Sequence, residues 1–304
     1  QTCRGSQSTE TGGNMGAEDT LRLDRTNAAI VVDSTADLSE GIAADPNLSM
    51  VPLNVHFGEE TFKDWVDIKP NEFYQRLAKA ERLPTTSQPP VGAFIQEYKR
   101  LRTQFERIFS VHLSAKLSGT FESATLAQRE VSGVTVIDSE VASMAVALLA
   151  RQLLGLLDRG TTEAEILEYV DRFRRESGRL FLLGSLEYLQ KGGRIGRASG
   201  LAGSLLNIKP LLTFQDGIVH PYKKVRGDQK ALAAMKDYFL DNTHPGRKVA
   251  VAIAHGDSPE RIDSVMELLS TTDRDFRVVL KGQVGSVIGT YAGPEAVALF
   301  FVEE

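Results

Sequence analysis

Residues 108–124, I-F-S-V-H-L-S-A-K-L-S-G-T-F-E-S-A, are the stretch that most constrains the fold of this chain. Residues 108–113 supply the apolar, partly β-branched run that is typical of a buried parallel strand. Residues 117–120 have the composition of a turn, and residues 121–129 favour a helix because they are rich in Ala and Leu. A buried strand followed directly by a turn and a helix indicates a parallel α/β sheet.

The turn in this stretch makes Ser118 a candidate ligand-binding residue. At the carboxyl end of a parallel strand, a strand-to-helix turn directs backbone N–H groups and hydroxyls toward a shared crevice, where anions bind well. Ser118 is therefore a candidate for holding a carboxylate. Serine is also a common helix cap, and from this stretch alone capping is the simpler interpretation.

Composition narrows the class of protein. The chain has 304 residues, of which 42% are hydrophobic and 25% charged, as in a globular protein of one large or two ordinary domains. A net charge of −5 argues against nucleic acid as the main partner. The single cysteine, Cys3, excludes a disulfide within the chain and favours a cytoplasmic location. The five histidines are scattered without zinc-site spacing, so no metal site is expected.

Periodicity divides the chain into two α/β halves behind a polar start. Residues 1–26 lack the apolar core of a secretory signal and are expected to be a disordered leader or tag. In residues 27–158, strands and helices alternate, which predicts a parallel, doubly wound (Rossmann-like) sheet. Residues 159–304 begin with a capping box at 162–165 and contain a hairpin around Asp216-Gly217, which predicts a mixed α/β domain with an antiparallel portion.

Several further segments give specific expectations. Residues 50–57 alternate apolar and polar positions and are expected to form one strand, whereas residues 83–90 are too proline-rich for a helix or an interior strand. Residues 199–206 are expected to be helical. Three hydroxyl-bearing loops are expected at the ends of elements, at 85–87, 118–120 and 286–291; hydroxyl and N–H groups bind a carboxylate well without acting on it chemically.

The glycine-rich, basic segment 191–197, K-G-G-R-I-G-R, keeps a second class of function open. It could hold a phosphate, which would fit an α/β phosphotransferase or hydrolase. It lacks the spacing of a P-loop and of a dinucleotide fingerprint, and a solvated glycine turn explains it at least as well. Ser118 has no nucleophile-elbow sequence around it, although a Ser-His-Asp triad with partners distant in sequence, such as His112, stays open.

A set of short motifs together resembles the DegV family, whose FakB members are bacterial fatty-acid-binding proteins. The motifs occur in the family's order and cover residues 28–302. They are D-S-T-A-D-L at 33–38, T-T-S-Q-P at 85–89, L-S-G-T-F at 117–121, K-G-G-R-I-G at 191–196, L-L-N-I-K-P at 205–210, K-V-R-G at 224–227 and V-I-G-T-Y-A-G-P at 287–294.

The resemblance implies a two-domain α/β protein that encloses one long-chain fatty acid, such as palmitate, in an interdomain tunnel. It implies that Thr86 and Ser118 bind the carboxylate, with Ser87, Gly119 and Thr120 beside them. The family's glycine-rich C-terminal motif usually carries His where this chain has Tyr291. A tyrosine hydroxyl can still donate to a carboxylate, but it is not a ready cation.

The resemblance also implies a carrier and not an enzyme. FakB members present the bound acid to a separate kinase, which forms an acyl phosphate, and the family's basic docking surface corresponds here to Arg194 and Arg226. No catalytic residue, cofactor or metal is expected in this chain. The expected partners are a long-chain fatty acid and a fatty acid kinase, with no nucleic acid and no integral membrane segment; transient membrane contact is compatible with this function.

Overall fold

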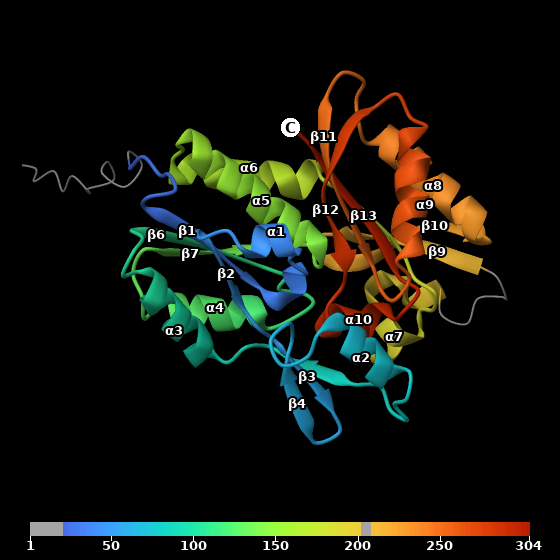
Figure 1. Cartoon of the computed structure of the whole chain (residues 1–304), viewed down its shortest axis with the longest axis horizontal. Helices are drawn as coiled ribbons and strands as arrows, with labels where there is room; N and C mark the ends of the chain where they lie inside the picture. The colour runs from blue at the N-terminus through green and yellow to red at the C-terminus, as the bar shows by residue number, and fades with distance from the viewer. Residues whose placement is uncertain (1–20, 202–207) are drawn as a thin grey trace, which may run out of the picture.

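The computed structural model describes residues 21–201 and 208–304. Figure 1 shows two α/β halves side by side, with a small third sheet below them. All strands of the four-stranded sheet come from residues 28–138, and all strands of the six-stranded sheet come from residues 178–303. The expected combination of a parallel sheet with a mixed sheet is confirmed.

The four-stranded sheet has the order β2-β1-β6-β7, and every neighbouring pair is parallel. Helices α3 and α4 pack on one face, and α5 packs on the other. The strands are almost continuously apolar because both faces are covered. The elements of this half are β1 (Ala28–Asp33), η1 (Ser34–Ala36), α1 (Glu40–Ala43), β2 (Leu48–Val51), α3 (Val91–Leu101), β6 (Arg107–His112), α4 (Thr120–Gln128), β7 (Val134–Asp138) and α5 (Met144–Arg159).

The six-stranded sheet has the order β10-β9-β8-β13-β11-β12, in which only β11 and β12 pair in parallel. Helices α8 and α9 cover one face of it. The predicted hairpin is present, with Asp216 and Gly217 at φ values of 50° and 74° between its strands. The elements are α6 (Glu163–Glu176), β8 (Gly178–Leu182), α7 (Glu187–Lys191), η2 (Gly196–Leu201), β9 (Ile208–Gln215), β10 (Ile218–Arg226), α8 (Asp228–Asp241), β11 (Lys248–His255), α9 (Glu260–Ser270), β12 (Asp275–Gln283), α10 (Ser286–Ala292) and β13 (Val297–Glu303).

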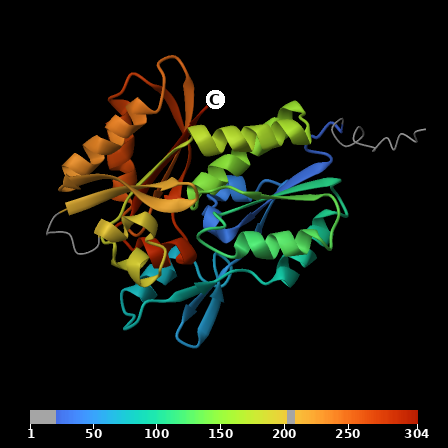
Figure 2. The ribbon, with the colours of Figure 1, turned by 180° about the vertical axis from the view of Figure 1, so that it is seen from behind.

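Helix α5 joins the two halves. One hydrophobic cluster contains α5 residues together with Ile30 of β1 and Phe300 of β13, so the core is continuous between the sheets. In Figure 1 and, from behind, in Figure 2, the yellow-green helix α5 runs along the blue-green half toward the orange half, with α6 above it. The two halves are therefore fixed relative to each other by shared burial of apolar surface.

The third sheet corrects two sequence-based expectations. Residues 50–57 form two strands, since the chain leaves β2 at Pro52, which has no N–H to donate, and the N–H of Leu53 binds the Ser34 hydroxyl. The expected loop at 83–90 contains a short edge strand, β5, between its prolines. The sheet order is β4-β3-β5, formed by β3 (Asn54–Phe57), β4 (Glu60–Lys63) and β5 (Thr85–Ser87), and α2 (Pro70–Leu77) lies beside it.

The expected loop at 286–291 was also wrong, because these residues belong to helix α10. Gly289 within it is unfavourable for an isolated helix. A Cβ on Gly289 would lie 2.6 Å from the Phe73 ring, and one on Gly285, which precedes the helix, would lie 2.3 Å from the Trp65 indole nitrogen. Close packing against these aromatic residues has overridden local helix propensity.

Residues 1–20 of the expected leader at 1–26 lie outside the described residues. The remaining part packs on the fold: Leu23 is buried, and its N–H and C=O pair with Thr161. Arg25 forms ion pairs with Asp45 and Asp158. The expected helix at 199–206 falls partly in residues 202–207, which also lie outside the described ranges, and residues 196–201 form a 3₁₀ helix.

Candidate functional site

An apolar cavity lies between the two halves of the molecule. It contains about 850 Å³ of space free of atoms, including its open mouth, which is in the usual range for small-molecule sites. One wall comes from three neighbouring strands, because Phe181, Ala298 and Ala254 are register partners across β8, β13 and β11 and so point to the same side of the sheet. Other apolar lining residues are Leu53, Leu113, Leu117, Leu183, Phe214 and Ile288.

The polar end of the cavity brings together three predicted site residues, Thr86, Ser118 and Tyr291, all of which line it. Thr86 Oγ1 lies 2.6 Å from the Tyr291 hydroxyl, so the two share one hydrogen bond. Strand alternation explains the position of Thr86, because its side chain is half-buried while Thr85 and Ser87 on either side are exposed.

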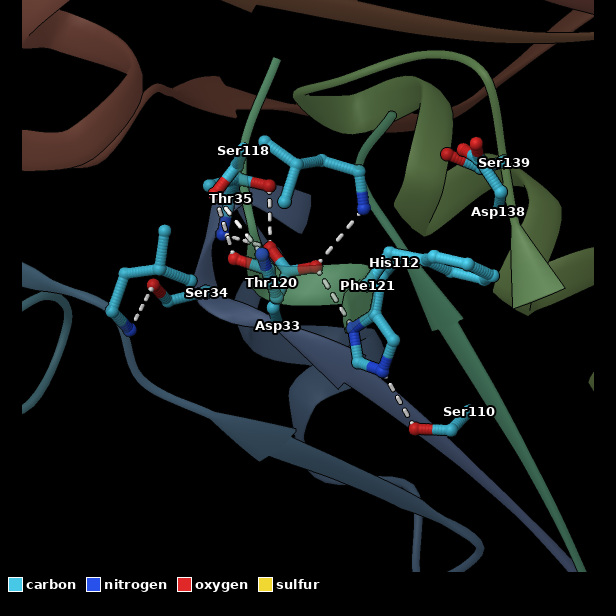
Figure 3. Close-up of polar contacts among 12 residues, drawn as sticks. Asp33, Ser34, Thr35, Ser110, His112, Ser118, Thr120, Phe121, Asp138 and Ser139 are labelled. Atoms are coloured by element: carbon cyan, nitrogen blue, oxygen red, sulfur yellow. Dashed lines mark hydrogen bonds and ion pairs between the residues drawn. The ribbon is translucent and has the colours of Figure 1, made fainter. Parts of the chain in front are cut away.

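Ser118 lines the cavity and also supports the turn that precedes α4. Its hydroxyl lies 2.9 Å from the Thr120 hydroxyl and accepts a 3.3 Å hydrogen bond from the Thr120 N–H (Figure 3). Thr120 itself is fully buried at the start of α4 and does not line the cavity. Gly119 lies against the Gln88 side chain, and a Cβ there would be 2.5 Å from its amide nitrogen. The turn at 118–120 is therefore packed closely onto the residue that follows β5.

Ser87 lies away from this group. Its hydroxyl bonds to His56 Nε2 at 3.0 Å and to the Asn54 amide at 3.3 Å on the exposed side of β5. It is not among the residues that line the cavity. Of the six residues expected around a carboxylate, the structure brings Thr86, Ser118 and Tyr291 together on the cavity wall.

Arg194 was expected on an outer docking surface, and its side chain also reaches the cavity. Its guanidinium stacks on the Tyr291 ring at 5.2 Å and donates to the Leu117 carbonyl at 3.2 Å and to the Gly192 carbonyl at 2.8 Å. It therefore bridges the glycine-rich segment and the turn that carries Ser118. Sequence spacing gave no signal for this contact, because 77 residues separate Arg194 from Leu117.

Arg226, the other expected docking residue, is exposed at the end of β10. Val219, near the start of the same strand, lines the cavity. At about 3.3 Å per residue, Arg226 lies roughly 23 Å along the strand from that point. Arg226 therefore lies at the end of β10 that is remote from the cavity residue Val219.

A Ser-His-Asp arrangement does exist, but it involves Ser110 and not Ser118. His112 Nδ1 lies 3.0 Å from the Asp33 carboxylate, and Nε2 lies 2.7 Å from the Ser110 hydroxyl (Figure 3). All three side chains are fully buried, and Ser110 also accepts a 2.7 Å hydrogen bond from the Tyr98 hydroxyl. Because none of the three lines the cavity, this network ties β1 to β6 and offers no accessible nucleophile.

Two buried carboxylates beside the cavity were not singled out from the sequence. Asp64 Oδ1 accepts hydrogen bonds from both the N–H and the hydroxyl of Ser286, and Asp37 accepts from the N–H of Gly285 and the hydroxyl of Ser143. Burial raises the pKa of Asp64 to about 6 and that of Asp37 well above its ordinary value. Asp37 belongs to the D-S-T-A-D-L motif, whereas Asp64 had no local signal at all.

Residues 21–201 and 208–304 contain no helix that is both long and apolar enough to cross a membrane. Within the same ranges, no group of three or more His, Cys, Asp or Glu side chains is arranged to hold a metal ion.

The fold and the cavity define an α/β protein with two main sheets and a mainly apolar cavity between its two halves. Residues 27–304 match the family model DegV, described as "Uncharacterised protein, DegV family", so the chain belongs to the DegV family. It is 35% identical over 277 residues to a protein of Thermotoga maritima named fatty acid-binding protein, covering 88% of this chain and 95% of that protein.

Solved structures agree with the fold. A DegV family protein from Thermus thermophilus, described by its fatty acid binding, matches with a TM-score of 0.87 and 30% identity, covering 91% of this chain and all of that one. DegV from Bacillus subtilis, described as a fatty acid binding protein, matches with a TM-score of 0.83 and 30% identity, covering 92% of this chain and all of that one.

Proposed function

We propose that this protein binds one long-chain fatty acid, with the acyl chain in the apolar cavity between the two halves and the carboxylate at its polar end. The observation that carries the proposal is the Thr86–Tyr291 hydrogen bond, a pair of hydroxyls on the wall of a mainly apolar cavity. The fatty-acid binding ascribed to relatives that cover nearly the whole chain supports it.

The carboxylate would be held mainly by hydroxyl donors. Thr86, Ser118 and Tyr291 each offer one O–H, and hydrogen bonds to a charged acceptor are stronger than those between neutral groups. When a carboxylate enters, the hydroxyls of Thr86 and Tyr291 can both donate to it, and these hydrogen bonds replace the one between them. Gly119 and Thr120 would shape the turn that presents Ser118.

Arg194 would supply positive charge at the same end. Its guanidinium already lies over the Tyr291 ring, and it is the only Lys or Arg side chain among those that line the cavity in the described part of the chain. A buried carboxylate is costly without a cation or several donors. Arg194 therefore compensates for a tyrosine at a position where histidine would have offered a charge.

Affinity and orientation would come from different parts of the ligand. Burial of each methylene contributes about 0.8 kcal/mol, so a tail of ~14 methylenes contributes on the order of 11 kcal/mol before ordering costs. The tail would dominate affinity, and the hydroxyl group would decide which end of the ligand faces the mouth.

We further propose that the protein acts as a carrier that presents the carboxylate to a separate fatty acid kinase in the cytoplasm. Arg194, exposed beside the polar end, and Arg226, exposed on β10, would contact the kinase. The boundary between the two functional domains would fall near residues 158–160, where α5 ends.

A direct binding experiment tests the ligand class. Displacement of a fluorescent fatty acid by palmitate, by its methyl ester and by hexadecane would separate the contributions of tail and headgroup. The proposal predicts that palmitate displaces the fluorescent fatty acid most effectively, the methyl ester less effectively and hexadecane least. Equal displacement by all three would contradict a carboxylate site, and no displacement by any of them would contradict an acyl-chain cavity.

A further inference from the structure

Helix α10 has two distinct faces. Val287, Ile288 and Tyr291 line the cavity, whereas Gly285 and Gly289 face residues of the first half of the chain. Positions three and four apart lie on the same side of a helix, so the two faces follow from the sequence spacing. Gly289 and Tyr291 belong to the same seven-residue helix, so the packing of the glycine face also helps to place Tyr291.

Two carboxylates hold the first turn of α10. Asp64 Oδ1 lies 2.8 Å from the Ser286 N–H nitrogen and 2.6 Å from its hydroxyl. Asp37 Oδ1 lies 2.7 Å from the Gly285 nitrogen, and its other oxygen accepts from the Ser143 hydroxyl at 2.7 Å. Asp37 and Asp64 come from the first half of the chain, whereas Gly285 and Ser286 come from the second.

Burying these two carboxylates costs desolvation free energy, which is unusual for side chains that have no specific role. Asp64 is fully buried and Asp37 is 1% exposed. Burial raises the pKa of both groups, and the charge of Asp64 raises that of Asp37 further. The Tyr74 hydroxyl of α2 also faces them, and its pKa is raised by burial and by both carboxylates.

Ser143 adds a second sign of constraint at this site. Its backbone has φ 61° and ψ −153°, a conformation that is essentially restricted to glycine. Its hydroxyl is bound by Asp37, and the residue lines the cavity. Asp37 therefore fixes Ser143, which precedes α5, and Gly285, which precedes the cavity-lining helix α10.

We propose that Asp37 and Asp64 are positioning residues of the cavity: by holding Gly285 and Ser286, they set the Tyr291 hydroxyl against Thr86, a role that rests on the fatty-acid binding proposed above. Neither Asp37 nor Asp64 lines the cavity itself. They act through α10, whose other end carries the hydroxyl that faces the ligand.

A double-mutant cycle tests this role. Palmitate affinity is measured for the unmodified protein, Asp64→Asn, Tyr291→Phe and the double variant. We expect Asp64→Asn to weaken binding at least fivefold in the protein that has Tyr291, and less than twofold in the Tyr291→Phe background, because no hydroxyl is then left to position. Glu59→Gln, an exposed acid in the same small sheet region, is the control and should leave affinity unchanged.

Ser286→Ala serves as a second variant if Asp64→Asn does not fold, since it removes one donor to Asp64 and leaves the carboxylate in place. It should show the same dependence on Tyr291. An equal loss with and without Tyr291, or no loss in either background, overturns the positioning role while fatty-acid binding itself survives. If the unmodified protein binds no palmitate, the proposed function and this role are overturned together.

Discussion

The hydroxyls of Thr86 and Tyr291 lie 2.6 Å apart although 205 residues separate them in the sequence. Thr86 comes from an edge strand of the small sheet, and Tyr291 comes from a helix that precedes the last strand of the six-stranded sheet. Each half of the chain thus contributes one hydroxyl to the same end of the cavity. Ligand orientation should accordingly depend on both halves being docked together.

Removing either hydroxyl should weaken recognition of the acid. We expect Tyr291→Phe and Thr86→Val each to lower palmitate affinity by about 1.5 kcal/mol, roughly tenfold, because a hydrogen bond to a charged group is lost. Affinity for the methyl ester should change much less. Isothermal titration with both ligands measures this. Thr85→Val, on the exposed side of the same strand, is the matched control, and a similar loss there would assign the effect to the strand.

Ser118→Ala should reduce headgroup selection more than total binding. The variant loses a donor at the cavity, and it also loses the acceptor for the Thr120 N–H, which should lower stability by up to about 1 kcal/mol. The ratio of acid to ester affinity separates the two effects, since a cap alone does not distinguish the ligands. An unchanged ratio would leave Ser118 with only its capping role.

Gly289→Ala should destabilise the protein even though alanine is the better helix former. The new methyl group would lie 2.6 Å from the Phe73 ring and 2.8 Å from the Tyr74 hydroxyl, both in the buried interface with α2. Overpacking of this kind typically costs about 1–3 kcal/mol. Gly92→Ala in α3 is the control, since nothing lies within 4 Å of its Cβ, and it should be neutral or slightly stabilising. Urea denaturation of both variants compares them directly.

The raised pKa of Asp64 should make the free energy of unfolding depend on pH. Its pKa of about 6 in the folded protein lies above the ordinary value of 3.8, so folding favours its protonated form. Its stabilising contribution is complete below about pH 3 and is lost as the pH rises through 6, which amounts to about 3 kcal/mol. The difference in unfolding free energy between Asp64→Asn and the unmodified protein should therefore shift by roughly this amount in favour of the variant from about pH 3 to pH 7. A difference that stays constant with pH would contradict the raised pKa.

Local signals predicted much of the fold. The helix at 163–176 was placed correctly because its capping box is written in adjacent residues, and the structure contains that box at Thr162 and Glu165. The hairpin around Asp216-Gly217 followed from its turn residues in the same way. Strands buried on both faces were recognisable from their continuous apolar runs.

Features that depend on distant contacts were not predictable. Helix α10 has a glycine-rich sequence that resembles a loop, and only its packing on Phe73 and Trp65 explains the helix. Arg194 appeared to be a surface residue because nothing near it in the sequence indicates the Tyr291 ring. Asp64 had no motif, since its significance comes from Ser286, 222 residues later. Ser118 was a candidate from its strand-to-helix turn, whereas the roles of Thr86 and Tyr291 came from the family resemblance.

The cavity wall offers a way to block the acyl chain without touching the polar end. Ala298 lies on β13 between Phe181 and Ala254, and its side chain faces the cavity. Ala298→Phe should fill part of this space, abolish detectable binding of palmitate and of its ester alike, and leave the protein folded. Circular dichroism checks the fold and fluorescence displacement checks the binding. Normal ester binding by this variant would mean that the tail lies elsewhere.

Native mass spectrometry of the protein purified directly from cells tests the central claim most directly. A single added mass equal to that of a C14–C18 fatty acid, released by organic extraction and absent from Ala298→Phe, is the expected result. A protein that carries no lipid, and that stays at its unliganded mass after incubation with excess palmitate, would contradict the proposed function.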